Sequence, residues 1–134
     1  MGRTCDSREG STLPRAVLIV DDSPTIRGFA KIFLKALQVD VTEAEEGMQA
    51  LELVRATPPA VIIVDINMPG MDGLTFTREL RGDARPEIAR LPVILLTGDR
   101  SEQIRQKGRD AGATDFLEKP IKGAELQAMV RKFL

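Results

Sequence analysis

Short apolar runs alternate along this chain with segments whose apolar positions recur every three or four residues. Three of the runs, at 16–20, 60–65 and 92–97, are apolar almost throughout. Runs this short, bounded by turn residues, are typical of strands that are buried on both faces of a sheet. An alternating segment at 39–43 suits a strand at or near the sheet edge, and a short segment at 114–119 completes a set of five predicted strands.

Each segment that follows a strand carries one apolar stripe, as amphipathic helices do. The first stripe begins at Ser23 and Pro24, which suit the cap and the first position of a helix. We predict five helices, near residues 24–37, 47–57, 73–82, 102–109 and 123–133. The longer connection at 83–91 has room for one helical turn around residues 87–89.

Strands that alternate with helices predict an α/β fold, a doubly wound parallel sheet covered on both faces. Right-handed crossovers place the carboxyl ends of all parallel strands at the same edge of the sheet, where ligands bind in open α/β folds. The polar residues at the ends of the predicted strands are Asp21, Asp22, Asp65, Thr97 and Lys119. We therefore expect these side chains to meet.

The chemistry of this set favours phosphoryl transfer. Three carboxylates repel one another unless a cation lies between them, and oxygen ligands without His or Cys suit Mg²⁺, with Mn²⁺ as a substitute ion. A carboxylate such as Asp65 can attack phosphorus to form an acyl phosphate. The Lys119 ammonium and the Thr97 hydroxyl would then meet other phosphoryl oxygens. Taken singly, each residue also has a local explanation, as a helix cap, a turn residue, a strand-end hydroxyl or a solvated charge.

Composition narrows the classes of function. The 134 residues suggest one domain, which we place at 15–134 after a polar tail at 1–14. The chain has no His, so it is not itself a histidine phosphodonor, and its net charge of −1 argues against direct nucleic-acid binding. Its single Cys fits a reducing compartment. Without an apolar run long enough to span a bilayer, we expect no membrane insertion and a cytoplasmic protein.

Four motifs carry a resemblance to a known family. They are Val-Leu-Ile-Val-Asp21-Asp22-Ser, Val-Asp65-Ile-Asn67-Met-Pro-Gly-Met-Asp-Gly, Leu-Leu-Thr97-Gly and Ala-Gly-Ala-Thr-Asp-Phe116-Leu-Glu-Lys119-Pro120. Together they resemble the response-regulator receiver domains of two-component signalling, which have the flavodoxin-like (CheY-like) fold with strand order 2-1-3-4-5.

The resemblance implies a role for each residue of the site. Asp65 is the expected phosphoacceptor, which is phosphorylated by a sensor histidine kinase or a histidine phosphotransfer domain. Asp21, Asp22, Asp65 and the backbone carbonyl of Asn67 are the expected Mg²⁺ ligands. The Lys119–Pro120 peptide bond is expected to be cis.

The resemblance also implies a switch. Thr97 is expected to move toward the phosphoryl group and Phe116 to turn inward behind it, which changes the face formed by residues 102–133 for partner binding. Gly98 stands where the family usually has Ala, and Phe116 lacks the hydroxyl of the more usual Tyr, so we expect a softer coupling. Asn67 and Asp99 stand at the positions that tune dephosphorylation, and their polarity predicts no unusually long-lived phosphorylated state.

Several alternatives stay open at this point. The chain is either a stand-alone receiver, as a monomer or weak dimer, or a receiver cut from a larger DNA-binding regulator or hybrid kinase. A phosphatase with an Asp nucleophile would need an acid two residues after Asp65, where this chain has Asn67. A flavin-binding protein would be expected to have a Ser- or Thr-rich phosphate loop in place of Asp21 and Asp22. Apart from its own phosphorylation and dephosphorylation, we expect no enzymatic activity.

Overall fold

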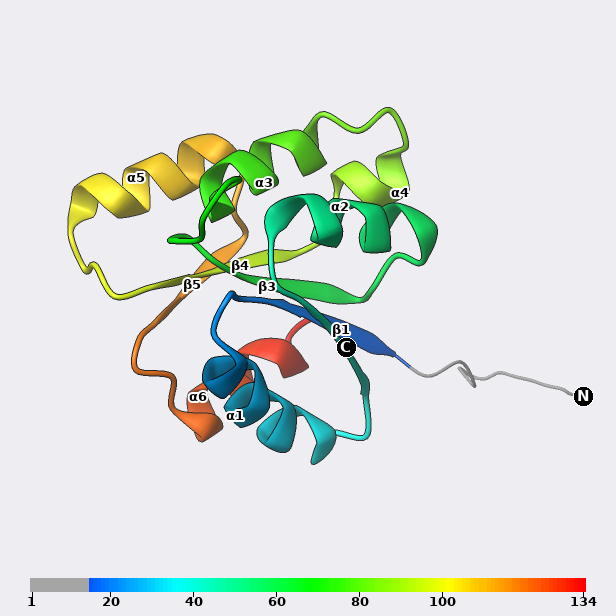
Figure 1. Cartoon of the computed structure of the whole chain (residues 1–134), viewed down its shortest axis with the longest axis vertical. Coiled ribbons are helices and arrows are strands. Elements are labelled where there is room, and N and C mark those ends of the chain that lie inside the picture. Colours follow the sequence, from blue (N-terminus) through cyan, green and yellow to red (C-terminus); the bar gives the residue numbers. More distant parts are fainter. Residues whose placement is uncertain (1–14) are drawn as a thin grey trace, which may run out of the picture.

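A parallel five-stranded sheet lies between two layers of helices in this computed structural model, which describes residues 15–134 (Figure 1). The strands are β1 (Ala16–Val20), β2 (Asp40–Ala44), β3 (Val61–Asp65), β4 (Val93–Thr97) and β5 (Asp115–Glu118). They lie in the order β2-β1-β3-β4-β5, so the predicted doubly wound topology is confirmed. The predicted tail at 1–14 lies outside the described residues.

Within residues 15–134, six helices cover the sheet, one more than predicted. They are α1 (Pro24–Lys35), α2 (Gly47–Ala56), α3 (Gly73–Arg81), α4 (Pro86–Ala89), α5 (Glu102–Ala111) and α6 (Gly123–Arg131). The additional helix, α4, is a single turn that buries Ile88 between α3 and β4. Four residues are too few to show a helical period, so the sequence pattern indicated only a turn there.

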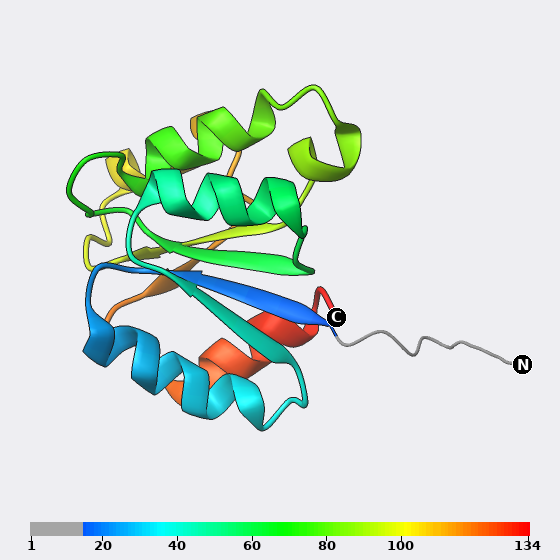
Figure 2. The same cartoon turned by 45° about the vertical axis from the view of Figure 1, so that its right-hand side comes forward.

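Figure 2 shows the two helical layers on either side of the sheet. Each layer encloses its own apolar cluster. Helices α1 and α6 pack on one face of the sheet, against residues such as Ile19 and Ile63. The other four helices cover the opposite face, against residues such as Leu18 and Leu95. Burial on both faces explains why β3 and β4 are apolar up to their last residues, Asp65 and Thr97, whereas the edge strand β2 alternates.

The register brings the carboxyl ends of the strands level. Asp65, the last residue of β3, pairs with Leu96 of β4, and Thr97 pairs with Glu118 of β5. The strand β5 ends one residue earlier than predicted, so Lys119 follows the strand and is not part of it. The consequence for the site is small, because Lys119 still projects from the same edge.

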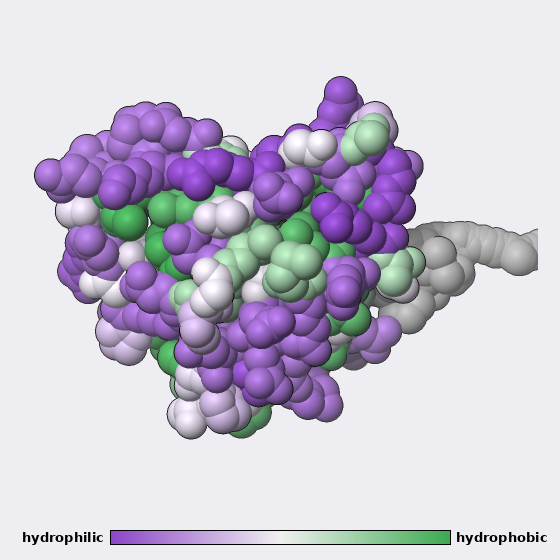
Figure 3. Space-filling model, turned by 45° about the horizontal axis from the view of Figure 1, so that its top comes forward, coloured by the Kyte–Doolittle hydropathy of each residue, from purple (hydrophilic) through white to green (hydrophobic). Residues whose placement is uncertain are grey.

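The helices present polar outer faces, and hydrophilic residues dominate the surface seen in Figure 3. Within residues 15–134, no helix combines the length and the apolar character needed to cross a membrane.

Candidate functional site

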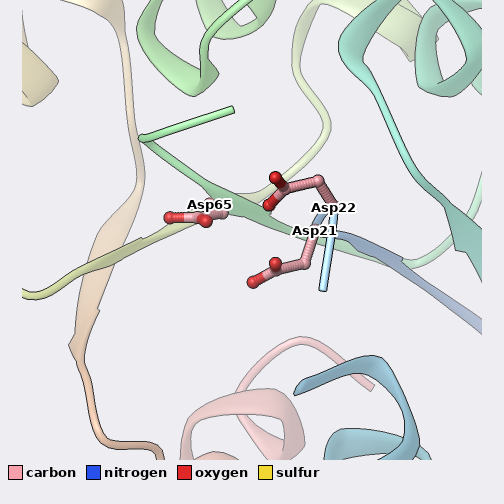
Figure 4. Close-up of side chains that lie close together, drawn as sticks. All are labelled: Asp21, Asp22 and Asp65. Atoms are coloured by element: carbon pink, nitrogen blue, oxygen red, sulfur yellow. The ribbon is translucent and has the colours of Figure 1, made fainter. Parts of the chain in front are cut away.

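Three carboxyl groups gather beyond the ends of β1 and β3 (Figure 4). Asp21, Asp22 and Asp65 each offer a carboxylate oxygen, and these oxygens lie within 4.8 Å of one another. Asp21 and Asp65 are buried, with 0% and 4% of their surface exposed, whereas Asp22 is exposed. The predicted meeting of these residues is therefore observed, and it leaves one open side toward solvent.

Backbone groups fix the two buried carboxylates. The Ser23 N–H donates to Asp21 Oδ1 at 2.9 Å, and the Asn67 N–H donates to Asp65 Oδ1 at 3.2 Å. The hydroxyl of Ser23 accepts from the Ile26 N–H and so caps α1. Because Ser23 is the cap, the alternative explanation of Asp21 as a helix cap does not apply.

Lys119 supplies the positive charge of the site. Its ammonium lies 2.9 Å from Asp65 Oδ2 and 3.3 Å from Asp21 Oδ2. Burial alone would lower the pKa of Lys119, but the hydrogen bond and negative charge of Asp65, together with Asp21, outweigh burial and raise it. Burial also raises the pKa of Asp65, with a further rise from the Asp21 charge and an opposing effect of Lys119.

One buried oxygen in the described part of the chain lacks a hydrogen-bond donor, and it is Asp21 Oδ2. The Lys119 ammonium is within ion-pair range of it but does not meet it in hydrogen-bond geometry. An unsatisfied buried carboxylate oxygen is costly. Because Asp21, Asp22 and Asp65 also bring carboxylate oxygens together here, the donor set fits a hard divalent cation such as Mg²⁺.

Two residues that sequence reasoning missed hold the site in place. Arg27 donates to the Asp21 carbonyl at 2.6 Å and pairs with Glu43 of β2 at 3.1 Å. Gly73 opens α3 directly against the backbone of Asp65, where an added Cβ would lie 2.5 Å from the Asp65 carbonyl oxygen. Helical spacing from Ser23 hints at Arg27, since it lies one turn later, but nothing local reveals its partners.

The Thr97 hydroxyl is engaged with the loop between β4 and α5. It donates to the Asp99 carbonyl at 3.1 Å and accepts from the Asp99 N–H at 2.9 Å. The Asp99 carboxylate accepts from the Ser101 N–H, which lowers the pKa of Asp99, and Ser101 in turn caps α5. The local explanation of Thr97, a strand-end hydroxyl bonded to nearby backbone, thus describes this conformation.

The predicted switch aromatic, Phe116, lies two strands away from Asp65 and packs beneath α5. The Lys119–Pro120 peptide bond is cis, as expected.

The fold and this acidic edge are those of a signalling receiver, and comparison with known proteins agrees. Residues 17–131 match the response regulator receiver domain family. The chain therefore belongs to that family.

Individual relatives extend the match. The chain is 37% identical over 122 residues to the DNA-binding dual master transcriptional regulator RpaA of Synechocystis, covering 91% of this chain and 49% of that one. The structure of the chemotaxis response regulator CheY4 of Vibrio cholerae superimposes with a TM-score of 0.84 at 32% identity, covering 91% of this chain and all of that one (100%).

The structure is also similar to the receiver domain of the sensor histidine kinase PA1611 from Pseudomonas aeruginosa, which was solved with a magnesium ion coordinated in its active-site cleft. The two superimpose with a TM-score of 0.81 at 31% identity, and the match covers 90% of this chain and 98% of that one. The chain spans about half the length, or less, of the curated relatives that it matches.

Proposed function

We propose that residues 15–134 act as a phosphoacceptor receiver, in which Asp65 takes a phosphoryl group from a sensor histidine kinase or a histidine phosphotransfer domain. The observation that carries this proposal is the arrangement of Asp65. It is a buried carboxylate at a strand end, 2.9 Å from an ammonium and within 4.8 Å of two further carboxylates.

The chemistry needs little beyond placement. An Asp65 oxygen attacks the phosphorus of a phosphohistidine, the new O–P bond forms, and the P–N bond breaks, so that the electron pair leaves with the imidazole nitrogen. Lys119 stabilises the charge on the phosphoryl oxygens, and Thr97 donates to one of them after its hydroxyl leaves the Asp99 backbone. The pairing with Lys119 favours the ionised nucleophile and opposes the effect of burial.

Asp21, Asp22, Asp65 and the Asn67 carbonyl are the residues that we expect to hold Mg²⁺. A bound Mg²⁺ would neutralise charge on the carboxylates and on a phosphoryl oxygen. The unsatisfied Asp21 Oδ2 supports this assignment more directly than the acidic cluster alone.

An apolar hollow of about 230 Å³ adjoins the site, and we propose it as the seat of the phosphodonor. Thr25, Ile26, Phe29, Pro120 and Ile121 line it. The first two follow the acidic pair in the chain and the last two follow Lys119, so a protein bound there would lie next to Asp65. Phe29 offers 38% of its surface for such a contact.

The remaining expectations follow from the same function. We propose a cytoplasmic protein, a monomer or weak dimer, without a catalytic activity other than turnover of its own phosphoryl group. Asn67 and Asp99 are the proposed positions that tune its hydrolysis, and the face of α5, β5 and α6 is the proposed output surface.

The test is phosphorylation with acetyl phosphate, or binding of beryllofluoride, with and without Mg²⁺. Intact mass should show one added phosphoryl group on the wild type with Mg²⁺ and none on Asp65→Asn, while beryllofluoride should shift amide NMR signals around the site. Asp40→Asn, an exposed aspartate at the start of the edge strand β2, is the matched control and should behave as wild type. Phosphorylation that survives in Asp65→Asn would move the acceptor elsewhere.

A further inference from the structure

The ring of Phe116 occupies a defined seat beneath α5. Phe116 pairs with Leu95 in the sheet, and both side chains lie on the face that α5 covers. An added Cβ on Gly108 would lie 2.5 Å from two carbons of the ring and 3.0 Å from Leu95 Cδ1. Glycine in the middle of a helix destabilises it, so the glycine here provides the space into which the ring fits.

Arg105 closes the seat from outside. Its guanidinium carbon lies 5.2 Å from the centroid of the Phe116 ring, within the range of a cation–π contact. Arg105 precedes Gly108 by three residues, so both face the same side of the helix. The ring, which is partly buried, is thus contacted by the sheet, by the helix at the glycine and by a cation.

Glu118 holds Arg105 over the ring. It lies two residues after Phe116 in β5, so both side chains project from the same face of the strand. Its carboxylate pairs with Arg105 at 3.4 Å and with Arg100 at 3.5 Å. The strand that carries the aromatic therefore also carries the anchor for the residue above it.

We propose that Arg105 and Gly108 are the positioning residues of Phe116, so that the ring changes place only when α5 shifts or the Arg105–Glu118 ion pair opens. This inference rests on the proposed receiver function, because it concerns the switch of that site. Phe116 has no hydroxyl group to fix its ring, and in this arrangement a contact from a neighbouring helix fixes it.

The same helix also connects with Thr97. The Thr97 hydroxyl bonds the Asp99 backbone, Asp99 bonds the Ser101 N–H, and Ser101 caps α5. Movement of Thr97 toward a phosphoryl group would break the first of these bonds at the start of the helix against which Phe116 packs. The two switch residues are therefore coupled through α5.

The first experiment observes Phe116 by aromatic ¹H–¹³C NMR in the metal-free, unphosphorylated protein, with its signals assigned by their loss in Phe116→Leu. Arg105→Gln should shift these signals. It should also bring the chemical shifts of the different CH groups of the ring closer together, because the ring becomes more mobile. Arg105→Lys, which keeps the cation, should restore most of the wild-type spectrum. Arg109 lies one turn beyond Arg105 in α5 and pairs with Glu102. Arg109→Gln is therefore the control and should leave the Phe116 signals unchanged.

Two further variants and one solvent condition sharpen the result. Gly108→Ala should displace the ring, and Glu118→Gln should reproduce part of the Arg105→Gln shift. Salt at about 1 M, where the Debye length is about 3 Å, should move the wild-type signals toward those of Arg105→Gln and leave that variant unchanged. If Gly108→Ala fails to fold, the arginine series decides alone.

The outcomes separate this inference from the function on which it rests. Phe116 signals of Arg105→Gln that match those of Arg109→Gln would overturn the positioning role, whatever the response to Mg²⁺ and beryllofluoride. A wild type that does not respond to Mg²⁺ and beryllofluoride would overturn the receiver function, while the spectra of the free protein would still report on Arg105. A double-mutant cycle of Thr97→Val with Arg105→Gln, read as the beryllofluoride-induced shift of Phe116, should be non-additive, and additive shifts would remove the coupling through α5.

Discussion

Two edges of the same sheet hold charged side chains away from full exposure to solvent, and these groups differ in how well their polar atoms are satisfied. At the carboxyl edge, Asp21, Asp65 and Lys119 face one another with one carboxylate oxygen lacking a donor. At the amino edge, the Arg81 guanidinium donates to the carbonyls of Gly112, Ala89 and Leu91 at 2.7–2.9 Å. Burial lowers the pKa of Arg81.

The comparison separates a structural charge from a functional one. Arg81 joins the end of α3, the turn α4 and the end of α5 through main-chain carbonyls that would otherwise lack donors at that edge, so every contact it makes stabilises the fold. The acidic edge instead keeps like charges together and leaves an acceptor unused, which destabilises the free protein and prepares it for a ligand.

The largest expected effect is on the rate of phosphorylation. Lys119→Ala removes the cation nearest to Asp65 and should slow phosphorylation by acetyl phosphate about 100-fold or more, since one charged or hydrogen-bonding group aimed at the transition state contributes on this scale. Mass spectrometry over time measures it. Lys122→Ala, three residues further along, is the control. Equal rates for Lys119→Ala and wild type would show that Lys119 does not assist phosphorylation. Its charge would then be structural, like that of Arg81.

The next effect is stabilisation by the ion itself. Magnesium at about 100 times its dissociation constant should raise the free energy of unfolding of the wild type by about 2.7 kcal/mol, because it binds only the folded state. Thermal unfolding with Mg²⁺ and with EDTA measures this difference. Asp21→Asn should lose most of it and Arg81→Lys should keep it. A Mg²⁺ effect of the same size in Asp21→Asn would remove that residue from the ligand set.

The amino edge should show the reverse behaviour. Arg81→Ala leaves three carbonyls without donors and should lower the free energy of unfolding by about 2 kcal/mol, on the scale of a few half-buried hydrogen bonds. Urea unfolding measures the loss. The phosphorylation rate of the folded fraction should stay at the wild-type value, and a specific loss of rate would show that the amino edge also serves the site.

The smallest effect concerns Glu43, which pairs with Arg27 and Lys31. The hydrogen bond from Lys31 and the bond and charge of Arg27 lower the pKa of Glu43 below its ordinary 4.5. A lowered pKa in the folded state gives stability that is present above pH 4.5 and is lost as the pH falls through the folded pKa. Glu43→Gln should thus cost about 0.5 kcal/mol at pH 7, a surface-pair value that salt reduces, and less at pH 3.

For that last pair, urea unfolding at the two pH values provides the measurement. A difference between Glu43→Gln and wild type that grows toward pH 3 would contradict the ion-pair explanation. It would point instead to packing of the Glu43 side chain.

Much of the candidate site was predictable because the ends of buried strands can be recognised in the amino-acid sequence. The apolar run before Asp65 predicts a buried strand, and the right-handed crossover rule then places Asp21, Asp22, Thr97 and Lys119 near it. The helix caps at Ser23 and Ser101 were equally accessible, since a cap bonds its own backbone. These features depend on residues within a few positions of one another or on a general rule of chain topology.

Other features were not predictable, because they depend on contacts between distant segments. Arg81 finds its partners up to 33 positions away, and a turn as short as α4 carries no periodic signal. The absence of a hydroxyl on Phe116 led to the expectation of a softer switch, which stays a hypothesis. The missing hydroxyl is visible in the sequence, whereas the contacts of Arg105 and Gly108 with the ring come from another element.

The class of fold, the order of its elements and the identity of the residues at one edge thus follow from the amino-acid sequence alone, since apolar periodicity and chain connectivity act locally. The packing of the folded chain, in contrast, sets which of those residues are buried, which oxygen lacks a donor, and what holds Phe116. Those properties arise from desolvation and from side chains that meet across elements. The position of Asp65 at the end of a strand follows from the amino-acid sequence, whereas the charged groups around it are brought there by the fold.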